Sequence, residues 1–308
     1  MSLDPQIAPL IEAFDAGFPP VHTMTGAQAR ATIRSRFVPP VKQEPVAEVW
    51  DDTIPGAAGA IPVRFYRPGV ADSLPILVYG HGGGFVFCDL DSHDELCRNL
   101  ANRIPAVVIS VNYRLAPEHP WPAAAEDFYA AARWAVDNAG VLGGDASRVV
   151  AGGDSAGGNL AAVTALMARD RGDPPLAGQL LLYPVIAADF DNESYRLFGK
   201  GFYNPKPAMQ WYWDQYVPAL ADRDHPYASP LRANLTGLAP AIVVVAGHDP
   251  LRDEGIAYAD ALEAAGVATV RCLFAGGIHG FMTMPMLDIA QEARRRACLE
   301  LAQLLRHG

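Results

Sequence analysis

The chain has 308 residues, 50% of them hydrophobic, and a formal net charge of −10 at pH 7. A chain this long and this apolar can bury a large core, so the composition argues against intrinsic disorder and favours one α/β domain with an appendage. The acidic balance argues against a nucleic-acid partner. The one dense basic run, Arg294 to Arg296, has Glu292 and Glu300 close by and is typical of a solvated helix face.

The N-terminus and the cysteines argue against a secreted, a membrane-spanning, a disulfide-bonded or a metal-binding protein. The first residues carry Asp4 and Glu12, where a secretory signal would be basic, and no stretch approaches the roughly 20 apolar residues of a membrane span. We therefore expect a cytoplasmic protein with no membrane partner. The four cysteines form no C-x-x-C pair and have no His at metal-ligand spacing, which predicts reduced thiols and no metal site.

Apolar runs of strand length recur along the chain. There are eight, at Glu48 to Ile54, Ile61 to Tyr66, Ile76 to Tyr79, Ala106 to Val111, Arg148 to Ala151, Leu180 to Val185, Ala241 to Ala246 and Thr269 to Phe274. Helical patterns separate the later runs, at about 92–103, 121–138, 156–170, 253–265 and 286–305. This alternation predicts an eight-stranded, mostly parallel sheet with helices on both faces.

A G-x-S-x-G pattern, residues 153–157, joins the fifth run to the helix that follows it. This context places Ser155 on a strand-turn-helix elbow, where small neighbours let the strand and the helix approach closely. The alternative is that Ser155 only caps the helix. Gly157 and Gly158 in the first turn are poor helix formers, which favours the interpretation of Ser155 as a nucleophile.

Two downstream strands end in polar residues that suit a nucleophilic serine. Asp249 is the first carboxylate after the seventh run, at the sheet edge where α/β sites form, whereas Asp253 and Glu254 lie where a helix begins. Of the eight histidines, His279 lies in a glycine-rich loop after the last strand and can reach that edge. The order Ser155, Asp249, His279 is the order that an α/β-hydrolase requires.

Five motifs together resemble the bacterial hormone-sensitive-lipase-like carboxylesterases. They are HGGGF at 81–85, YRLAPEHPWPAA at 113–124, GDSAGGNLAA at 153–162, DPLRDEG at 249–255 and HGF at 279–281. The resemblance covers the chain from about residue 45 onwards and implies the α/β-hydrolase fold with a helical cap. It divides the chain into a first part of the cap (1–45), hydrolase core (46–185), a second part of the cap (186–232) and hydrolase core (233–308).

The resemblance also assigns roles to residues outside the triad. It implies that the backbone N–H groups of Gly83, Gly84 and Ala156 bind the oxyanion, of which only Ala156 also follows from the elbow itself. It implies that His81 holds the glycine loop in place without transferring protons. Met209 and Trp213 share one face of a helix expected over Pro207 to Leu220, and by resemblance they face the acyl pocket. A second helix is expected near the N-terminus, where Ile7, Leu10, Ile11 and Phe14 recur at helical spacing.

The predicted function is hydrolysis of short-chain acyl esters, with a small-molecule ester as substrate and no metal or organic cofactor. A lipase, an amidase and a peptidase can use the same residues and stay open as alternatives. A non-catalytic ligand-binding protein on this fold is the alternative from another class, which an intact Ser155, Asp249 and His279 disfavours. By resemblance, the eighth strand and its neighbouring helix are also where a homodimer would form.

Overall fold

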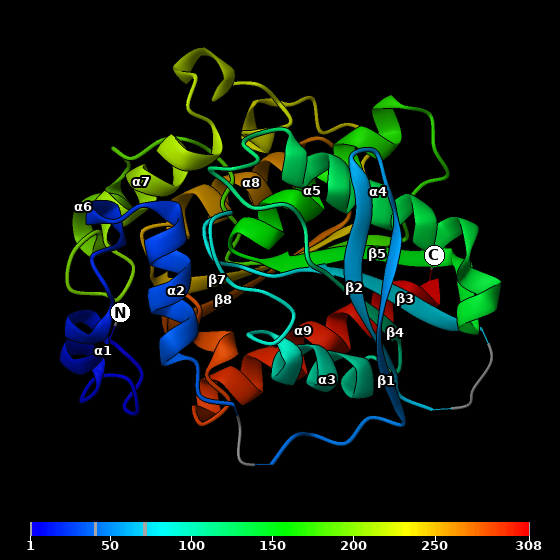
Figure 1. Ribbon diagram of the computed structural model, residues 1–308, viewed down its shortest axis with the longest axis horizontal. Coiled ribbons are helices and arrows are strands. Elements are labelled where there is room, and N and C mark those ends of the chain that lie inside the picture. The colour runs from blue at the N-terminus through cyan, green and yellow to red at the C-terminus, as the bar shows by residue number, and fades with distance from the viewer. Residues whose placement is uncertain (1, 40–41, 70–72, 308) are drawn as a thin grey trace.

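The computed structural model describes residues 2–39, 42–69 and 73–307. An eight-stranded sheet lies at its centre, with the strand order β1-β2-β4-β3-β5-β6-β7-β8 (Figure 1). The strands are β1 (Glu48–Gly56), β2 (Gly59–Arg67), β3 (Leu74–Gly80), β4 (Val107–Val111), β5 (Gly144–Asp154), β6 (Gly178–Leu182), β7 (Ala241–His248) and β8 (Thr269–Ile278). The predicted eight-stranded α/β fold is confirmed.

The sheet is antiparallel at one side and parallel over the rest. Strand β2 pairs antiparallel with both β1 and β4, and every pair from β4 to β8 is parallel. In the parallel part the register sets Gly80 beside Gly153 and Asp154 beside Leu182. The carboxyl ends of β3, β5 and β6 therefore meet at one edge of the sheet, where the loops that follow them can form a site.

Helices cover both faces of the sheet because the central strands are apolar on both sides. Ile76 and Val78 of β3 pack with α4 (Ala123–Asp137), α5 (Ala156–Asp170) and α8 (Arg252–Ala264) in one cluster. Leu77 and Tyr79 pack with α3 (Asp94–Arg103) and α9 (Asp288–His307) in the other. Figure 1 shows these two layers above and below the strands. Because successive side chains of β3 point to opposite faces of the sheet, they pack into two separate hydrophobic cores.

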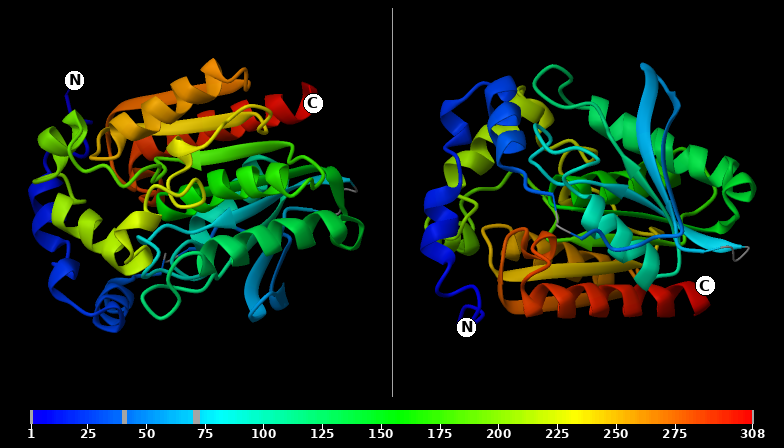
Figure 2. Two further views of the ribbon diagram at one scale, coloured as in Figure 1. Left: turned by 90° about the horizontal axis from the view of Figure 1, so that it is seen from above. Right: turned by 60° about the horizontal axis from the view of Figure 1, so that its bottom comes forward.

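The remaining helices gather at one end of the molecule, far from the C-terminus (Figure 2). They are α1 (Ile11–Gly17), α2 (Gly26–Arg36), α6 (Glu193–Phe198) and α7 (Lys206–Tyr216), and short 3₁₀ helices lie at Val21–Thr23, Ala139–Leu142, Leu220–Asp222, Pro230–Arg232 and Phe281–Thr283. The ring of Tyr203 packs against Phe14 and Phe18, and its N–H donates to Asp15. The N-terminal segment and the insertion between β6 and β7 therefore contact each other. The division into core and cap stays a prediction.

Two other expectations concern membranes and thiols. No helix in the described ranges combines the length and the hydropathy that a membrane span requires. All four cysteines are free thiols, as predicted: Cys88, Cys97, Cys272 and Cys298.

Candidate active site

Ser155 stands on a strained turn between β5 and α5. Its backbone has φ of 54° and ψ of −115°, a conformation that non-glycine residues rarely adopt. The turn is held from both sides, because the N–H of Ser155 donates to Leu182 O at 2.9 Å and its carbonyl accepts from Val185 N at 3.1 Å. These two hydrogen bonds to the end of β6 and the residues after it therefore hold Ser155 in its strained backbone conformation.

The positions next to Ser155 require glycine because the backbones of β3, β5 and α5 are in direct contact there. A Cβ on Gly157 would lie 1.9 Å from Gly80 O, and a Cβ on Gly153 would lie 2.4 Å from the carbonyl carbon of Gly157. Both distances are far inside van der Waals contact. Only glycine therefore lets α5 start this close to the end of β3.

The three residues predicted as a triad come together in one hydrogen-bonded line. His279 Nε2 lies 3.0 Å from Ser155 Oγ, and His279 Nδ1 lies 2.7 Å from Asp249 Oδ2. The other carboxylate oxygen, Asp249 Oδ1, accepts from Leu251 N at 2.8 Å, and the side chain of Asp249 is buried. Each residue follows the carboxyl end of a strand, β5, β7 or β8.

The competing carboxylates serve another part of the chain. Asp253 accepts from Ser194 N at 2.8 Å, and Glu254 accepts from Ile186 N at 2.7 Å. Burial raises the pKa of Glu254 well above its ordinary value. Both residues therefore anchor the start of the insertion after β6, and Asp249 is the carboxylate that holds His279.

The glycine loop after β3 has a geometry that side chains would prevent. Gly83 and Gly84 have φ of 109° and 59°, and a Cβ would lie 2.2 Å from Phe87 O at Gly83 and 2.4 Å from the Tyr212 ring at Gly84. Within the described residues, neither N–H donates a hydrogen bond to the protein. Ala156 is the first residue of α5, so its N–H has no acceptor within the helix.

Asp154, next to Ser155 in the chain, connects the elbow to this loop by hydrogen bonds. Its carboxylate accepts from Tyr79 OH at 2.8 Å and from Gly82 N at 3.0 Å, and lies 3.1 Å from His93 Nε2. Burial raises the pKa of Asp154, but the neighbouring His93 and the hydrogen bonds from His93 and Tyr79 outweigh burial and hold that pKa below its ordinary value. Nothing in the sequence pattern indicates this pairing of Asp154 with His93.

His81 is buried at the start of the glycine loop. Its ring stacks on Tyr113 with centroids 4.4 Å apart, and its Nδ1 lies 2.7 Å from Gly82 O. Burial, assisted by the nearby His93, lowers the pKa of His81 to about 4. At neutral pH the ring is therefore uncharged, and it is not hydrogen-bonded to any of the triad residues.

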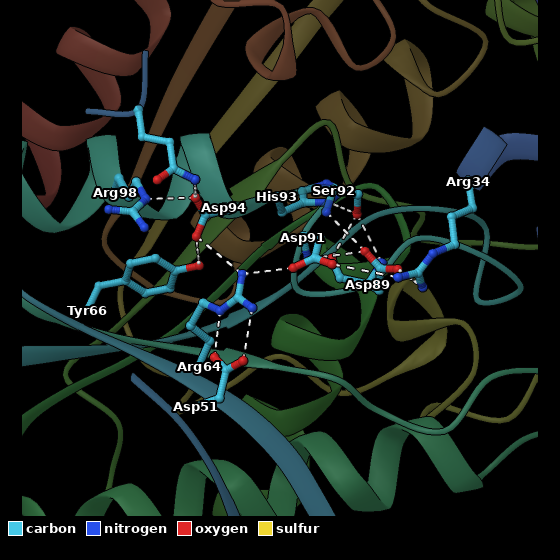
Figure 3. A network of polar contacts seen from close by, with 11 residues as sticks. Arg34, Asp51, Arg64, Tyr66, Asp89, Asp91, Ser92, His93, Asp94 and Arg98 are labelled. Carbon is cyan, nitrogen blue, oxygen red and sulfur yellow. Dashed lines mark hydrogen bonds and ion pairs between the residues drawn. The ribbon is translucent and has the colours of Figure 1, made fainter. Parts of the chain in front are cut away.

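From His93, a polar network continues to Arg34 of the N-terminal helix α2 (Figure 3). His93 Nδ1 lies 2.9 Å from Ser92 Oγ, and Asp89 accepts from Ser92 N at 3.0 Å. Arg34 of α2 donates to Asp89 at 2.9 Å and lies 3.7 Å from Asp91. Sequence periodicity cannot reveal this attachment, because it runs through charged side chains on loops.

A cavity of about 120 Å³ opens beside Ser155. Its lining residues are Phe18, Gly82, Gly83, Gly84, Phe87, Cys88, His93, Asp154, Ser155, Tyr203, Asn204, Tyr212, His279, Gly280 and Thr283. Met209 and Trp213 are buried in α7 and are not among them, whereas Tyr212 of the same helix is. Met209 reaches the cavity only indirectly, because its Sδ accepts from Asn204 Nδ2 at 3.1 Å.

No group of three or more His, Cys, Asp or Glu side chains that could hold a metal ion occurs in the part of the chain that the structure describes. The site contains an oriented serine, a histidine, a carboxylate and backbone N–H groups that donate to no protein acceptor in the described residues. These are the groups that acyl transfer requires.

Comparison with known proteins places this geometry in a family. Residues 77–283 match the family described as the alpha/beta hydrolase fold. Carboxylesterase NlhH of Mycobacterium tuberculosis is 40% identical over an alignment of 311 positions, which covers 98% of this chain and 96% of NlhH. The chain belongs to the hormone-sensitive-lipase-like carboxylesterases.

Further similarities agree with this carboxylesterase family. The carboxylic ester hydrolase LipN of the same bacterium is 48% identical over 244 residues, which are 77% of this chain and 65% of LipN. The solved structure of a hyperthermophilic esterase from the archaeon Pyrobaculum calidifontis superposes with a TM-score of 0.91 at 40% identity, covering 99% of each chain. The carboxylesterase described here is therefore a hydrolase of carboxylic esters.

Proposed function

We propose that this carboxylesterase hydrolyses esters of short-chain acids through Ser155, His279 and Asp249, with an acyl-enzyme intermediate. The observation that carries the proposal is the pair of hydrogen bonds at His279, which joins Ser155 Oγ to Asp249 Oδ2 through one imidazole. An enzyme with this line of contacts has a nucleophile, a general base and a group that orients the base.

In the first half-reaction Ser155 Oγ attacks the ester carbonyl carbon while His279 Nε2 accepts the hydroxyl proton. Asp249 keeps the remaining imidazole proton on Nδ1 and stabilises the imidazolium. The tetrahedral intermediate then collapses, His279 donates its proton to the leaving alcohol oxygen, and the acyl group stays on Ser155.

In the second half-reaction a water molecule takes the place of the alcohol. His279 accepts a proton from that water as it attacks the acyl-enzyme carbonyl, and returns the proton to Ser155 Oγ when the acid leaves. In both half-reactions the developing oxyanion accepts hydrogen bonds from the N–H groups of Gly83, Gly84 and Ala156. The unused N–H groups of the two glycines support this assignment.

The size of the cavity beside Ser155 supports a short acyl chain. A volume of about 120 Å³ has to hold the reacting carbonyl as well as the acyl group. Each methylene that fits adds about 0.8 kcal/mol of burial, whereas each one beyond the wall costs overpacking strain. Tyr212 and Phe87 form part of that wall, whereas Met209 and Trp213, which the resemblance predicts to face the acyl pocket, are not among the residues that line this cavity.

The test is a series of p-nitrophenyl esters of increasing acyl length, measured with the wild-type enzyme and with Ser155→Ala. We expect kcat/KM to peak at about four to six acyl carbons, and Ser155→Ala to lose several orders of magnitude in turnover on every ester. Retention of more than about a tenth of wild-type turnover by Ser155→Ala would remove the serine from the mechanism.

The same assay separates the other functions on this fold. A lipase would prefer long-chain insoluble esters, and an amidase or a peptidase would cleave a matched p-nitroanilide at a rate comparable to the ester. A protein that only binds ligands would turn over none of these compounds.

A further inference from the structure

A second, larger cavity lies against the small one. Its volume is about 910 Å³, and it runs between α2, the loop after the glycine motif and the segment that follows His279. The two cavities share Phe18, Cys88, His93, Tyr203 and Thr283 in their linings. The two cavities are therefore adjacent along these five residues.

The chemistry of catalysis decides which part of an ester enters this larger cavity. The leaving oxygen must lie within hydrogen-bond reach of His279 Nε2, because His279 protonates it. Gly280 and Thr283 follow His279 along the chain and line the small cavity, and the residues from Thr283 to Met286 line the larger one. The alcohol side of a bound ester therefore points toward the larger cavity.

The acyl side is directed the other way. Asn204, Tyr212 and Phe87 line the small cavity only, and the ring of Tyr212 packs on Gly84 in the glycine loop. An acyl group that leaves the carbonyl away from His279 meets these side chains and finds room for few carbons.

The charged groups of the larger cavity have protein partners. Arg34 pairs with Asp89 and Asp91, Arg30 pairs with Glu118, and Glu95 pairs with the buried Arg294. Arg36 also lines the cavity; it donates to the carbonyl oxygen of Gly17, and no ion pair is found for it among the described residues. Most of the charges that line the cavity are therefore compensated within the protein. Apolar side chains supply much of the remaining wall, including Phe18, Ile33, Phe37, Leu96, Leu115 and Met286.

We propose that the larger cavity is the binding site for the alcohol part of the substrate, and that the enzyme acts on short-chain esters of bulky, uncharged, largely apolar alcohols. This inference rests on the proposed function. A volume of about 910 Å³ is in the range of a binding site for a drug-sized molecule. An ethyl or methyl leaving group would leave most of it to water.

Two pairs of isomeric esters test the proposal with the wild-type enzyme alone. The first pair is 2-phenylethyl acetate and ethyl phenylacetate, and the second is octyl acetate and ethyl octanoate, whose acyl chain is longer than the expected optimum. The members of a pair have the same atoms and carry the bulk on opposite sides of the ester. Each kcat/KM is divided by the rate constant of hydroxide-catalysed hydrolysis, so that intrinsic reactivity cancels.

We expect the acetate of each pair to be preferred by at least about 10-fold in corrected kcat/KM. Equal values, or a preference for the ethyl esters, would overturn the inference. If Ser155→Ala is inactive on all four esters in that case, the proposed function still stands. Activity of Ser155→Ala would instead refute the proposed function.

A matched pair of variants on α2 locates the site. Ile33 lines the larger cavity, whereas Ala31 is exposed on the same helix and lines neither cavity. Ile33→Trp should lower the ratio of kcat/KM for 2-phenylethyl acetate over methyl acetate by about 10-fold. Ala31→Trp should leave that ratio as in the wild type. An unchanged ratio in a folded Ile33→Trp enzyme, checked by circular dichroism, would place the alcohol elsewhere.

Discussion

Replacing Asp249 by Asn should inactivate the enzyme by trapping His279 in the wrong tautomer. In the wild type, Asp249 Oδ1 accepts from Leu251 N at 2.8 Å and Oδ2 lies 2.7 Å from His279 Nδ1. The asparagine must keep its carbonyl oxygen toward Leu251 N, because the opposite orientation sets two N–H donors against each other in a buried site. Its NH₂ group then donates to His279 Nδ1.

This inversion moves the imidazole proton to Nε2, the atom that lies 3.0 Å from Ser155 Oγ. A protonated Nε2 cannot accept the serine proton, so the nucleophile is not activated. A loss of about 10⁴-fold in kcat is expected, which corresponds to roughly 5.4 kcal/mol of transition-state stabilisation. The fold should be unaffected, because the shape of the side chain is unchanged.

The assay is steady-state hydrolysis of p-nitrophenyl butyrate, with Asp253→Asn as the matched control. Asp253 is a carboxylate on the same loop-helix junction, but it holds Ser194 and does not contact His279. Asp253→Asn should keep most of the activity and lose under about 1 kcal/mol of stability. If Asp253→Asn is the inactive variant and Asp249→Asn is active, the acid of the triad has been misassigned.

Three further outcomes can be checked. The pKa of His81 is lowered to about 4, so the unfolded chain binds more protons between about pH 4 and 6.5. The free energy of unfolding should therefore fall by up to about 3 kcal/mol as pH drops through this window, and urea titrations of His81→Phe should show a smaller fall. Gly157→Ala should lower the free energy of unfolding by at least about 2 kcal/mol, measured by thermal unfolding, because the new Cβ would clash with Gly80 O. Gly140→Ala is the control and should be tolerated, because no atom lies within 4 Å of the position of its Cβ. Light scattering should give a dimer mass, since β8 is an edge strand with Leu273 exposed; a mass near 33.0 kDa at micromolar concentrations argues against it.

The strands, and the meeting of Ser155, Asp249 and His279 at one edge of the sheet, were predictable because buried parallel strands are continuous apolar runs. The run Ala241 to Ala246 lies in β7, and the next polar residues along the chain include Asp249. Helix α5 begins and ends at the predicted residues 156 and 170. In such a sheet, the residue that follows a strand lies at the carboxyl edge whatever the surrounding loops do, so sequence order alone brings Ser155, Asp249 and His279 to one place.

Strand ends were less predictable, because they depend on pairing and not on apolarity. The sixth apolar run extends to Val185, yet β6 ends at Leu182. Tyr183 adopts a φ of 35°, which turns the chain away from the sheet. In the other direction, β5 begins at Gly144, four residues before the apolar run, because its exposed start still pairs with Leu74 of β3.

Helices α2 and α7, which line the cavities, show a different limit of prediction from sequence. Helix α7 is apolar on several sides, so periodicity cannot select Tyr212 over Trp213 as the residue that faces the cavity. Helix α2 is mostly polar, and its contacts to the loop after β3 run through Arg30 and Arg34. Such contacts depend on tertiary distances that no sequence period records.

Beyond the side chains that the two cavities share, each has lining residues in a stretch of its own. Residues 30–38 contribute to the larger cavity only, whereas Asn204 and Tyr212 line the smaller one only. A mutation in either stretch leaves β5, β7 and the elbow as they are. With the two cavities in their proposed roles, related enzymes can therefore change their alcohol specificity and their acid specificity by separate substitutions. The arrangement of Ser155, Asp249 and His279 stays the same in each step.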